Sequence, residues 1–384
     1  MTRAASYIWQ QPDWPRLSYD GGKISGAVGA ARRAQGLVEG RLSAIGLPAR
    51  QQLAAETWAQ DAVATAAIEG ERLDLDAVRS SVCRRLGVES AKASRVPRNV
   101  EGLLDVMEDA VDRAAEPLTD ARLQAWQQAL FPTGFSGLNP VRVNAYRDRR
   151  EPMQIVSGPV GRVKGHYEAP PSRRVPAEMK RFLKWFNEGA EPDLLVRAAL
   201  AHLWFETIHP FEDGNGRVGR AIVDLTLARD VGDPTRMPRI SRQLSDNRDA
   251  YYEQLQRTQH GGLDVTSWIA WFISQIHEAC DKAASVVDLA LSKATFWATH
   301  ADKELNARQR KVLKVLLDAG PGGFEGGMNT RKYEALTGTS RATASRELIE
   351  LGKTGFLVVV GAGRSTRYYV NMDGWVAMAA GEVS

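Results

Sequence analysis

The feature that most constrains this chain is an apolar segment, Leu194–Ile208, which runs directly into His209-Pro210. The segment is apolar on most sides, which predicts a buried helix. Pro210 cannot continue that helix, so we expect the His209 imidazole at a fixed, buried edge. The polar sequence Phe-Glu-Asp-Gly-Asn-Gly-Arg-Val-Gly-Arg follows and ends at Arg220. The first expectation is therefore a buried helix followed by a tight polar turn.

This polar turn has the features of an anion-binding site. Gly214 and Gly216 flank Asn215, so the backbone can turn tightly and approach a ligand closely. A second helix is expected to begin here, and its first N–H groups have no partner within the helix. Arg217 and Arg220 lie three residues apart and share one face of that helix. Positive side chains oppose the helix dipole at this end, so their presence favours a polyphosphate ligand.

The residue types of the turn also allow a metal ion. Asp213 is placed to hold a Mg²⁺ ion that bridges phosphate oxygens. A zinc site made by His202, His209 and Asp213 is the alternative, but the seven-residue spacing of the two histidines fits no common metal motif. A lone His-Pro is usually a helix end and a lone Gly-Asn-Gly is usually a turn. Here they occur together with a carboxylate and two arginines within twelve residues, which favours a functional site.

The string from His209 to Arg220 resembles the signature of the Fic family, HxFx(D/E)GNGRxxR, and matches it at every defined position. The resemblance extends over roughly residues 7–275. The segment Ile8–Pro15 is similar to a domain that often precedes Fic cores in bacteria, as in the long bacterial type. A predicted β-hairpin resembles the family's flap, which pins a target segment beside the active site; its flap residues are Ile155, Val156, Ser157 and Gly158.

The resemblance implies that the chain transfers AMP from ATP. His209 would be the general base that takes the proton from a Ser, Thr or Tyr hydroxyl of a target protein. Asp213 would ligate Mg²⁺. Relatives that transfer phosphate carry Lys at the position of Gly216, so glycine favours AMP transfer. Tyr251 and Tyr252 are candidates for the adenine pocket, with helix packing as the alternative for each.

The resemblance also implies which groups hold the phosphates. Backbone N–H groups of Gly214 and Gly216, with the Asn215 amide, would bind the α- and β-phosphates. Arg217 would balance charge on the β-phosphate and on the leaving pyrophosphate, and Arg220 would bind the γ-phosphate.

A second motif implies that this activity is restrained. Thr65-Ala-Ala-Ile-Glu69-Gly70 fits the family's inhibitory pattern, (S/T)xxxE(G/N), on a helix that precedes the core. Glu69 would pair with Arg220 and occupy the space that the γ-phosphate needs, because a carboxylate matches guanidinium as phosphate does. We therefore expect a resting enzyme that is autoinhibited in cis.

The expected fold is mainly α: a Fic-type helical bundle with a short β-hairpin flap and a C-terminal winged helix-turn-helix. The predicted domains are an N-terminal helical domain with the inhibitory motif (1–96), the catalytic core (97–285), and a linker helix with the winged helix (286–384). Three helices followed by a hairpin are the order of a winged helix. Its candidate DNA-binding residues are Arg341, Arg346, Arg364 and Arg367, and protein contact or dimer packing is the alternative.

The composition restricts the remaining function classes. The net charge of +4 is small and does not by itself favour nucleic acid. Cys83 and Cys280 have no metal or disulfide pattern. We find neither a signal peptide nor an apolar run long enough for a membrane helix, so a cytoplasmic protein without a membrane partner is expected.

Three functions stay open at this point. The first is a protein adenylyltransferase, with self-modification and a homodimer both compatible with the sequence. The second is the reverse reaction, in which Glu69 positions a water that removes AMP from a target. The third is a transcriptional regulator that senses nucleotide through the core and binds DNA through the winged helix.

Overall fold

The computed structural model describes residues 7–88, 96–157, 164–189, 191, 193–232, 239–373 and 375. It divides the chain into two compact units, Met1–Ala284 and Ser285–Ser384. The N-terminal helices pack into the same compact unit as the motif helices. Among the helices of these described ranges, none combines the length and the apolar character needed to cross a membrane.

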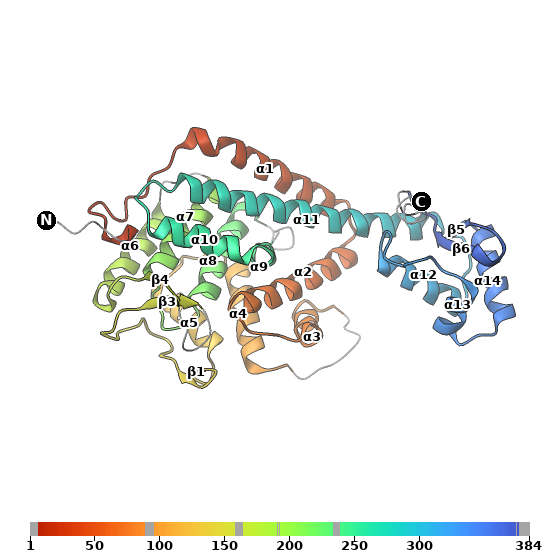
Figure 1. Cartoon of the computed structure of the whole chain (residues 1–384), viewed down its shortest axis with the longest axis horizontal. Helices are drawn as coiled ribbons and strands as arrows, with labels where there is room; N and C mark the ends of the chain where they lie inside the picture. The colour runs from red at the N-terminus through yellow and green to blue at the C-terminus, as the bar shows by residue number, and fades with distance from the viewer. Residues whose placement is uncertain are drawn as a thin grey trace. The chain divides into compact units, whose positions relative to one another are not determined.

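Unit 1 is built almost entirely of helices, as Figure 1 shows. Its α-helices are α1 (Gly21–Ser43), α2 (Leu47–Ile68), α3 (Leu75–Arg85), α4 (Arg98–Asp112), α5 (Asp120–Leu130), α6 (Val175–Glu188), α7 (Leu194–Ile208), α8 (Asn215–Val231), α9 (Ser241–Asp246), α10 (Arg248–Gln259) and the first part of α11 (Thr266–Thr299). Short 3-10 helices occur at Ile8–Gln10 and Ser172–Arg174.

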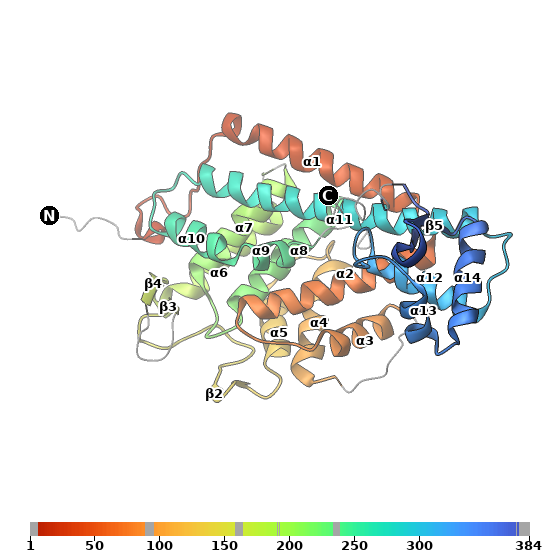
Figure 2. The same ribbon diagram turned by 45° about the vertical axis from the view of Figure 1, so that its right-hand side comes forward.

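Helix α7 forms the centre of the unit 1 core. It is buried on nearly every side and packs along α8 and against α6. From α11, the indole Nε1 of Trp268 donates a hydrogen bond to the Ala199 carbonyl of α7 at 2.8 Å. The starts of α1 and α11 are joined by backbone bonds between Ser18 and residues 263 and 265, and Figures 1 and 2 both show the two helices side by side. The apolar pattern of Leu194–Ile208 therefore corresponds to a fully surrounded helix.

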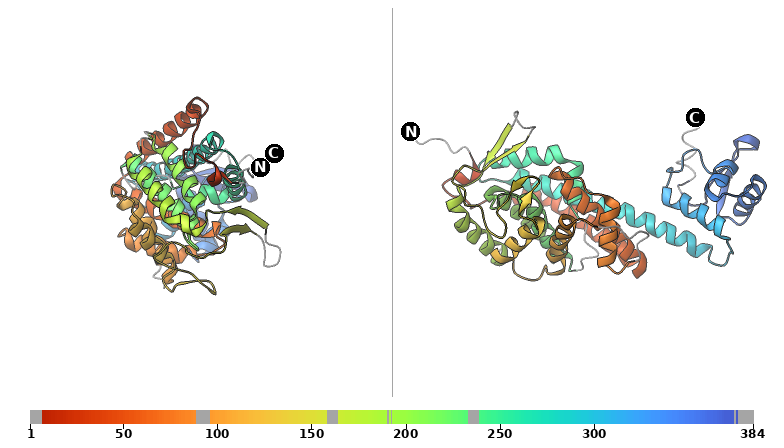
Figure 3. Two further views of the ribbon diagram at one scale, coloured as in Figure 1. Left: turned by 90° about the vertical axis from the view of Figure 1, so that its left-hand side faces the viewer. Right: turned by 90° about the horizontal axis from the view of Figure 1, so that it is seen from below.

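Two small antiparallel hairpins interrupt the helices of unit 1. One pairs β1 (Phe135–Ser136) with β2 (Asn139–Pro140). The other pairs β3 (Gln154–Ser157) with β4 (Lys164–Glu168), with a bulge between Ile155 and Val156. In Figure 3 this second hairpin stands out from the helical body. It contains the predicted flap, of which Gly158 lies outside the described residues.

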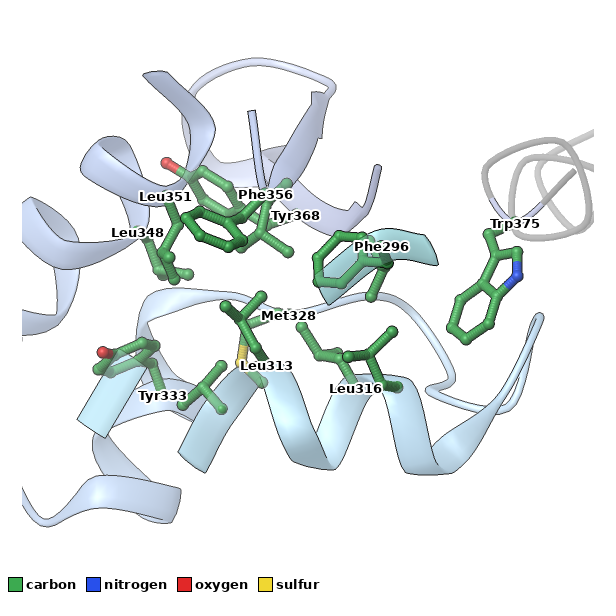
Figure 4. Close-up of a cluster of buried hydrophobic side chains, with 14 of the residues drawn as sticks. Phe296, Leu313, Leu316, Met328, Tyr333, Leu348, Leu351, Phe356, Tyr368 and Trp375 are labelled. Atoms are coloured by element: carbon green, nitrogen blue, oxygen red, sulfur yellow. The ribbon is translucent and has the colours of Figure 1, made fainter. Parts of the chain in front are cut away.

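Unit 2 has a core of its own. The end of α11 is followed by α12 (Ala307–Ala319), α13 (Thr330–Thr337), α14 (Arg341–Lys353), β5 (Leu357–Val360), a 3-10 helix (Gly363–Ser365) and β6 (Arg367–Val370). β5 and β6 are antiparallel neighbours. Figure 4 shows apolar side chains from these elements meeting in one cluster, among them Phe296, Leu313, Tyr333, Leu348 and Phe356. Three helices and a hairpin are thus present in the order expected from the sequence.

A pair of buried carboxyl groups joins α2 to α8. Asp61 of α2 and Asp224 of α8 are 1% and 2% exposed. Burial raises the pKa of both groups, and the charge of Asp61 raises that of Asp224 further. The Arg239 and Arg220 guanidinium groups lower both pKa values, and that of Asp224 is about 7. A carboxyl group that keeps its proton below about pH 7 therefore lies where the helix with the inhibitory motif meets the motif helix.

This pair predicts a dependence of stability on pH. The pKa of an aspartate in the unfolded chain is about 4. Between that value and about 7 the folded protein keeps a proton on Asp224 that the unfolded chain has lost, so the free energy of unfolding falls as pH rises through this window. Asp224→Asn should reduce this fall, measured by denaturant unfolding at a series of pH values. The exposed Asp249→Asn variant serves as control, and equal pH slopes for wild type and Asp224→Asn would contradict the prediction.

Candidate active site at the end of helix α7

The site begins where α7 ends. The Asp193 carboxylate caps the start of this helix by accepting from the N–H groups of Leu195 and Val196. At its other end the His209 N–H still bonds the Phe205 carbonyl at 2.9 Å, and His209 then adopts a left-handed conformation with φ 50° and ψ 62°. A positive φ is uncommon for a residue other than glycine and needs support from its surroundings.

Arg147 supplies that support, although nothing in the sequence around it predicts this role. Its guanidinium donates to the carbonyls of His209 at 2.7 Å and of Ile208 at 3.2 Å, and also to the Pro170 carbonyl at 2.5 Å. Its own N–H bonds the Pro210 carbonyl at 2.9 Å. Burial lowers the pKa of Arg147 to about 10. This cation therefore fixes the turn that carries the His209 side chain.

Removing this support should misplace the imidazole. In Arg147→Ala three buried carbonyl groups would lose their donor, at a cost of about 1–3 kcal/mol for each unsatisfied buried group. We expect a lower melting temperature and a loss of any reaction that needs His209 in place. The matched control is Arg150→Ala, because Arg150 is an exposed arginine of the same segment. Equal thermal stability and equal activity of the two variants would show that Arg147 does not hold the turn.

The polar turn after His209 is shaped by Asn215 and Gly214. The Asn215 carboxamide accepts from the Phe211 N–H and donates to the Phe211 carbonyl, both at 2.9 Å. Gly214 has φ 89°, and a side chain there would lie 2.9 Å from the Phe131 ring. Asn215 as a whole is only 2% exposed, so its carboxamide is part of the loop's own framework. The N-terminal N–H groups of α8 can serve as anion donors of the turn.

Glu69 and Arg220 lie together, although they are far apart in the sequence. Arg220 is 1% exposed, and its Nη2 lies 2.8 Å from Glu69 Oε1. Thr65 holds the same guanidinium, since its hydroxyl accepts from Nε at 2.7 Å and its carbonyl accepts from Nη2 at 3.0 Å. Gly70, with φ 83°, turns the chain away just after Glu69. Two residues of the predicted inhibitory motif, Thr65 and Glu69, thus contact the last arginine of the signature.

The Glu69 carboxylate also lies against the glycine turn. A Cβ atom added to Gly216 would be 2.2 Å from Glu69 Oε1 and 3.0 Å from Arg220 Nη1. The absence of a side chain at Gly216 therefore leaves the space in which the Glu69 carboxylate approaches the first turn of α8.

Arg217 has a second carboxylate partner that the sequence reasoning missed. Its Nη1 lies 2.9 Å from Glu71 Oε1, and its guanidinium lies over the Phe131 ring at 5.0 Å. Its Nη2 is 3.8 Å from Asp213 Oδ1. Both arginines of the signature are thus paired with carboxylates from the residues that follow α2. The sequence could have indicated this pairing through Glu71, the acidic residue that directly follows the predicted motif.

Asp213 has room to take part in metal binding. Its side chain is 39% exposed, and Oδ1 accepts from the Gly214 N–H. Among the residues that the structure describes, no three His, Cys, Asp or Glu side chains gather into a metal site. The alternative set of His202, His209 and Asp213 is therefore not assembled. One carboxylate beside an anion-binding turn fits a Mg²⁺ ion that takes its other ligands from phosphates and water.

The two candidate tyrosines of the adenine pocket differ. Tyr251 is 2% exposed, and its hydroxyl lies 2.9 Å from His202 Nε2, so the structure favours helix packing for this residue. Tyr252 is 37% exposed, and its hydroxyl donates to the Ile68 carbonyl at 3.3 Å. Tyr252 therefore lies beside Glu69 at the edge of the site.

The remaining predicted residues lie on two other elements. In the flap, Ile155 pairs with Tyr167, Val156 with Gly165 and Ser157 with Lys164. In unit 2, Arg341 and Arg346 are exposed on α14, Arg364 is exposed before β6, and Arg367 is half-buried and donates to the Arg364 and Thr366 carbonyls.

Comparisons with known proteins agree with this geometry. Residues 7–88 match a family described as a domain of unknown function, DUF4172, and residues 117–227 match the Fic/DOC family. The chain is 28% identical over 99 residues to a probable protein adenylyltransferase of Aquifex aeolicus and 32% identical over 88 residues to protein adenylyltransferase fic-1 of Caenorhabditis elegans. These matches cover 26% and 22% of this chain, and 28% and 16% of those proteins.

Solved structures show the same fold. A Fic family protein from Desulfovibrio desulfuricans G20 aligns with a TM-score of 0.53 at 21% identity, over 90% of this chain and 95% of that one. Fic-1 from C. elegans aligns with a TM-score of 0.52 at 19% identity, over 70% of this chain and 74% of that one. The mainly helical arrangement around α7 and α8 is thus shared with these Fic proteins. The segment that matches the Fic/DOC family, residues 117–227, includes His209, its turn and both arginines.

Proposed function

We propose that this chain is a protein adenylyltransferase that moves AMP from ATP to a Ser, Thr or Tyr hydroxyl of a target protein. The observation that carries the proposal is the convergence of His209, the N-terminus of α8 and two buried arginines on one turn of a Fic/DOC family domain. The similarity to proteins named protein adenylyltransferase supports it.

In the proposed reaction, the target hydroxyl oxygen attacks the α-phosphorus of ATP and the bond from this phosphorus to the bridging oxygen of the β-phosphate breaks. His209 takes the hydroxyl proton, and pyrophosphate leaves. The N–H groups of the α8 N-terminus hold the phosphates, and Arg217 and Arg220 neutralise charge on the β- and γ-phosphates. A Mg²⁺ ion held by Asp213 would supply further positive charge to the phosphate oxygens. Positioning and charge stabilisation account for most of the catalysis.

We propose further that the chain rests in an inhibited state. In this state the Glu69 carboxylate competes with a γ-phosphate for the Nη2 group of Arg220, which Thr65 holds in place. The support for this step is the 2.8 Å contact, together with the space that Gly216 leaves for the carboxylate. Removal of AMP from a target uses the same groups and stays an alternative direction of the reaction. DNA binding by unit 2 stays a prediction that rests on the exposed Arg341, Arg346 and Arg364.

The position of the transferred label tests the proposal. The full chain and its Glu69→Gly variant are incubated with cell lysate and with either α-³²P-ATP or γ-³²P-ATP. We expect protein-bound label from the α-labelled nucleotide only, because the α-phosphorus is attacked and pyrophosphate leaves. The γ-labelled reaction is the control for contaminating kinases. If γ-label were transferred to protein only when this chain is present, the reaction would be phosphate transfer and the proposal of AMP transfer would be wrong.

A further inference from the structure

A buried carboxylate that the sequence reasoning did not use lies beside the candidate base. Glu206 precedes His209 by three residues on α7, so the two side chains share one face of the helix. Glu206 Oε2 lies 3.7 Å from His209 Nδ1, and the side chains are 6% and 15% exposed. The contact involves Nδ1 and leaves Nε2 of the imidazole for another partner.

Both side chains, and the neighbouring His202, have a buried polar atom without a hydrogen-bond partner among the described residues. Among the described residues, His209 Nδ1 and Glu206 Oε1 are both buried without a hydrogen-bond partner. A separation of 3.7 Å is longer than a hydrogen bond, but a small rotation of the imidazole would close it. Catalytic hydrogen bonds are often long before the substrate binds and tighten in the complex.

The surroundings keep Glu206 ionised. Burial alone would raise its pKa, but the His209 contact and the charges of His202, His209 and Arg220 outweigh burial and lower it. The other polar groups that face this carboxylate are the hydroxyls of Tyr251 and Tyr252. A buried anion next to an imidazole favours a proton on the near nitrogen and stabilises the imidazolium that forms when the far nitrogen takes a proton.

The helix opposite is shaped to admit this carboxylate. A Cβ atom added to Gly219 of α8 would lie 2.5 Å from Glu206 Oε1 and 3.3 Å from the His202 ring. Of the two glycines in Gly-Arg-Val-Gly-Arg, Gly219 faces α7, whereas Gly216 faces Glu69. The close packing of α7 on α8 therefore depends on glycine beneath Glu206 and His202.

We propose that Glu206 is a positioning residue for the reaction: its carboxylate holds the proton of His209 on Nδ1, so that Nε2 is the atom that accepts the proton of the target hydroxyl. When Nε2 takes that proton, His209 becomes an imidazolium and Glu206 balances its charge while remaining ionised. The role of this tautomer in AMP transfer rests on the proposed function. The position of the proton on Nδ1 does not depend on that function.

The tautomer can be measured on the wild-type chain without any activity. Full-length protein labelled with ¹⁵N at its histidines gives imidazole nitrogen shifts, and His209→Ala identifies the signals of His209. At a pH where the imidazole is neutral, we expect the proton on Nδ1. A proton mainly on Nε2 overturns the proposal even if the chain transfers AMP. A proton on Nδ1 in a chain that transfers no AMP would instead count only against the proposed function.

Variants then connect the tautomer to the rate. Glu206→Gln keeps the shape but removes the charge, and its amide can donate to Nδ1 and so favour the wrong tautomer. In the Glu69→Gly background we expect AMP transfer at saturating ATP to fall by about 10²-fold or more, with an unchanged KM for ATP and altered His209 nitrogen shifts.

The matched control is Glu178→Gln on α6. Glu178 is a buried glutamate, 1% exposed, that is paired with Arg174 and Arg181 instead of a histidine. The Glu178→Gln variant should leave the nitrogen shifts of His209 and the rate at saturating ATP unchanged, even if it lowers the melting temperature. Glu206→Gln with unchanged nitrogen shifts, or with a loss of rate no larger than that of Glu178→Gln, overturns the proposal.

Discussion

His209→Ala is expected to remove AMP transfer while leaving nucleotide binding nearly intact. The imidazole is held at the end of α7 by a left-handed turn, and its place in the reaction is to take one proton. Loss of a general base typically lowers the rate by about 10²–10⁴-fold. The phosphates would still be bound by the α8 N-terminus and by the two arginines, so the affinity for ATP should change little.

The measurement is incorporation of label from α-³²P-ATP, combined with a binding titration of ATP. Both are carried out in the Glu69→Gly background, so that a slow resting rate does not hide the loss. His260→Ala is the control, because His260 is an exposed histidine of the same unit. Transfer at the parent rate in His209→Ala would rule out His209 as the base.

Glu69→Gly is expected to raise AMP transfer, including self-modification, by one or more orders of magnitude. In the structure Nη2 of Arg220 donates to the Glu69 carboxylate, and a γ-phosphate oxygen would need the same donor. Without this carboxylate, Arg220 stays beside Thr65 and becomes free to bind phosphate. The Glu69 contact favours the inhibited state by some free energy, and removing each 1.4 kcal/mol of it raises the population of the productive state about tenfold.

The substitution should not unfold the protein. Glu69 follows the last residue of α2, and its side chain is 28% exposed. Glycine inside a helix costs about 1 kcal/mol, and a position at the helix end costs no more. Arg220→Ala removes the same ion pair but should not raise transfer, because Arg220 is also needed for the γ-phosphate.

Glu71→Gly is the matched control for Glu69→Gly. Glu71 lies two residues away and pairs with Arg217 instead of Arg220, so this variant releases a charge without opening the γ-phosphate position. We expect a smaller rise in transfer than for Glu69→Gly. An unchanged or inactive Glu69→Gly enzyme, or an equal rise in both variants, would argue against specific inhibition by Glu69.

The sequence alone predicted those parts of the site that local chemistry determines. The apolar run Leu194–Ile208 can only be a buried helix, Pro210 ends it, and the glycines allow the tight turn that starts α8. The pairing of Glu69 with Arg220 joins distant segments, and it was predicted only because both belong to recognisable motifs. Without those motifs, no periodicity or charge pattern relates two residues so far apart.

Other parts of the site depended on packing between distant segments. Arg147 lies in an irregular segment, and nothing near it in the sequence shows that it caps α7. Tyr251 and Tyr252 are neighbours in sequence, yet one is buried on His202 and the other reaches Ile68, because successive helical residues face different directions. The packing of α2 against α8 and α9 likewise joins segments that are far apart in the sequence.

Glu206 lies between these two cases. A carboxylate in a mostly apolar helix, three residues before His209, was visible in the sequence, and a buried charge needs a partner. The sequence therefore determined that such a residue must be paired, whereas the fold decided which group it faces. That choice was made by the close approach of α8 at Gly219, since only tertiary packing excludes water from a site and so makes a separation of a few ångströms between two charges decisive.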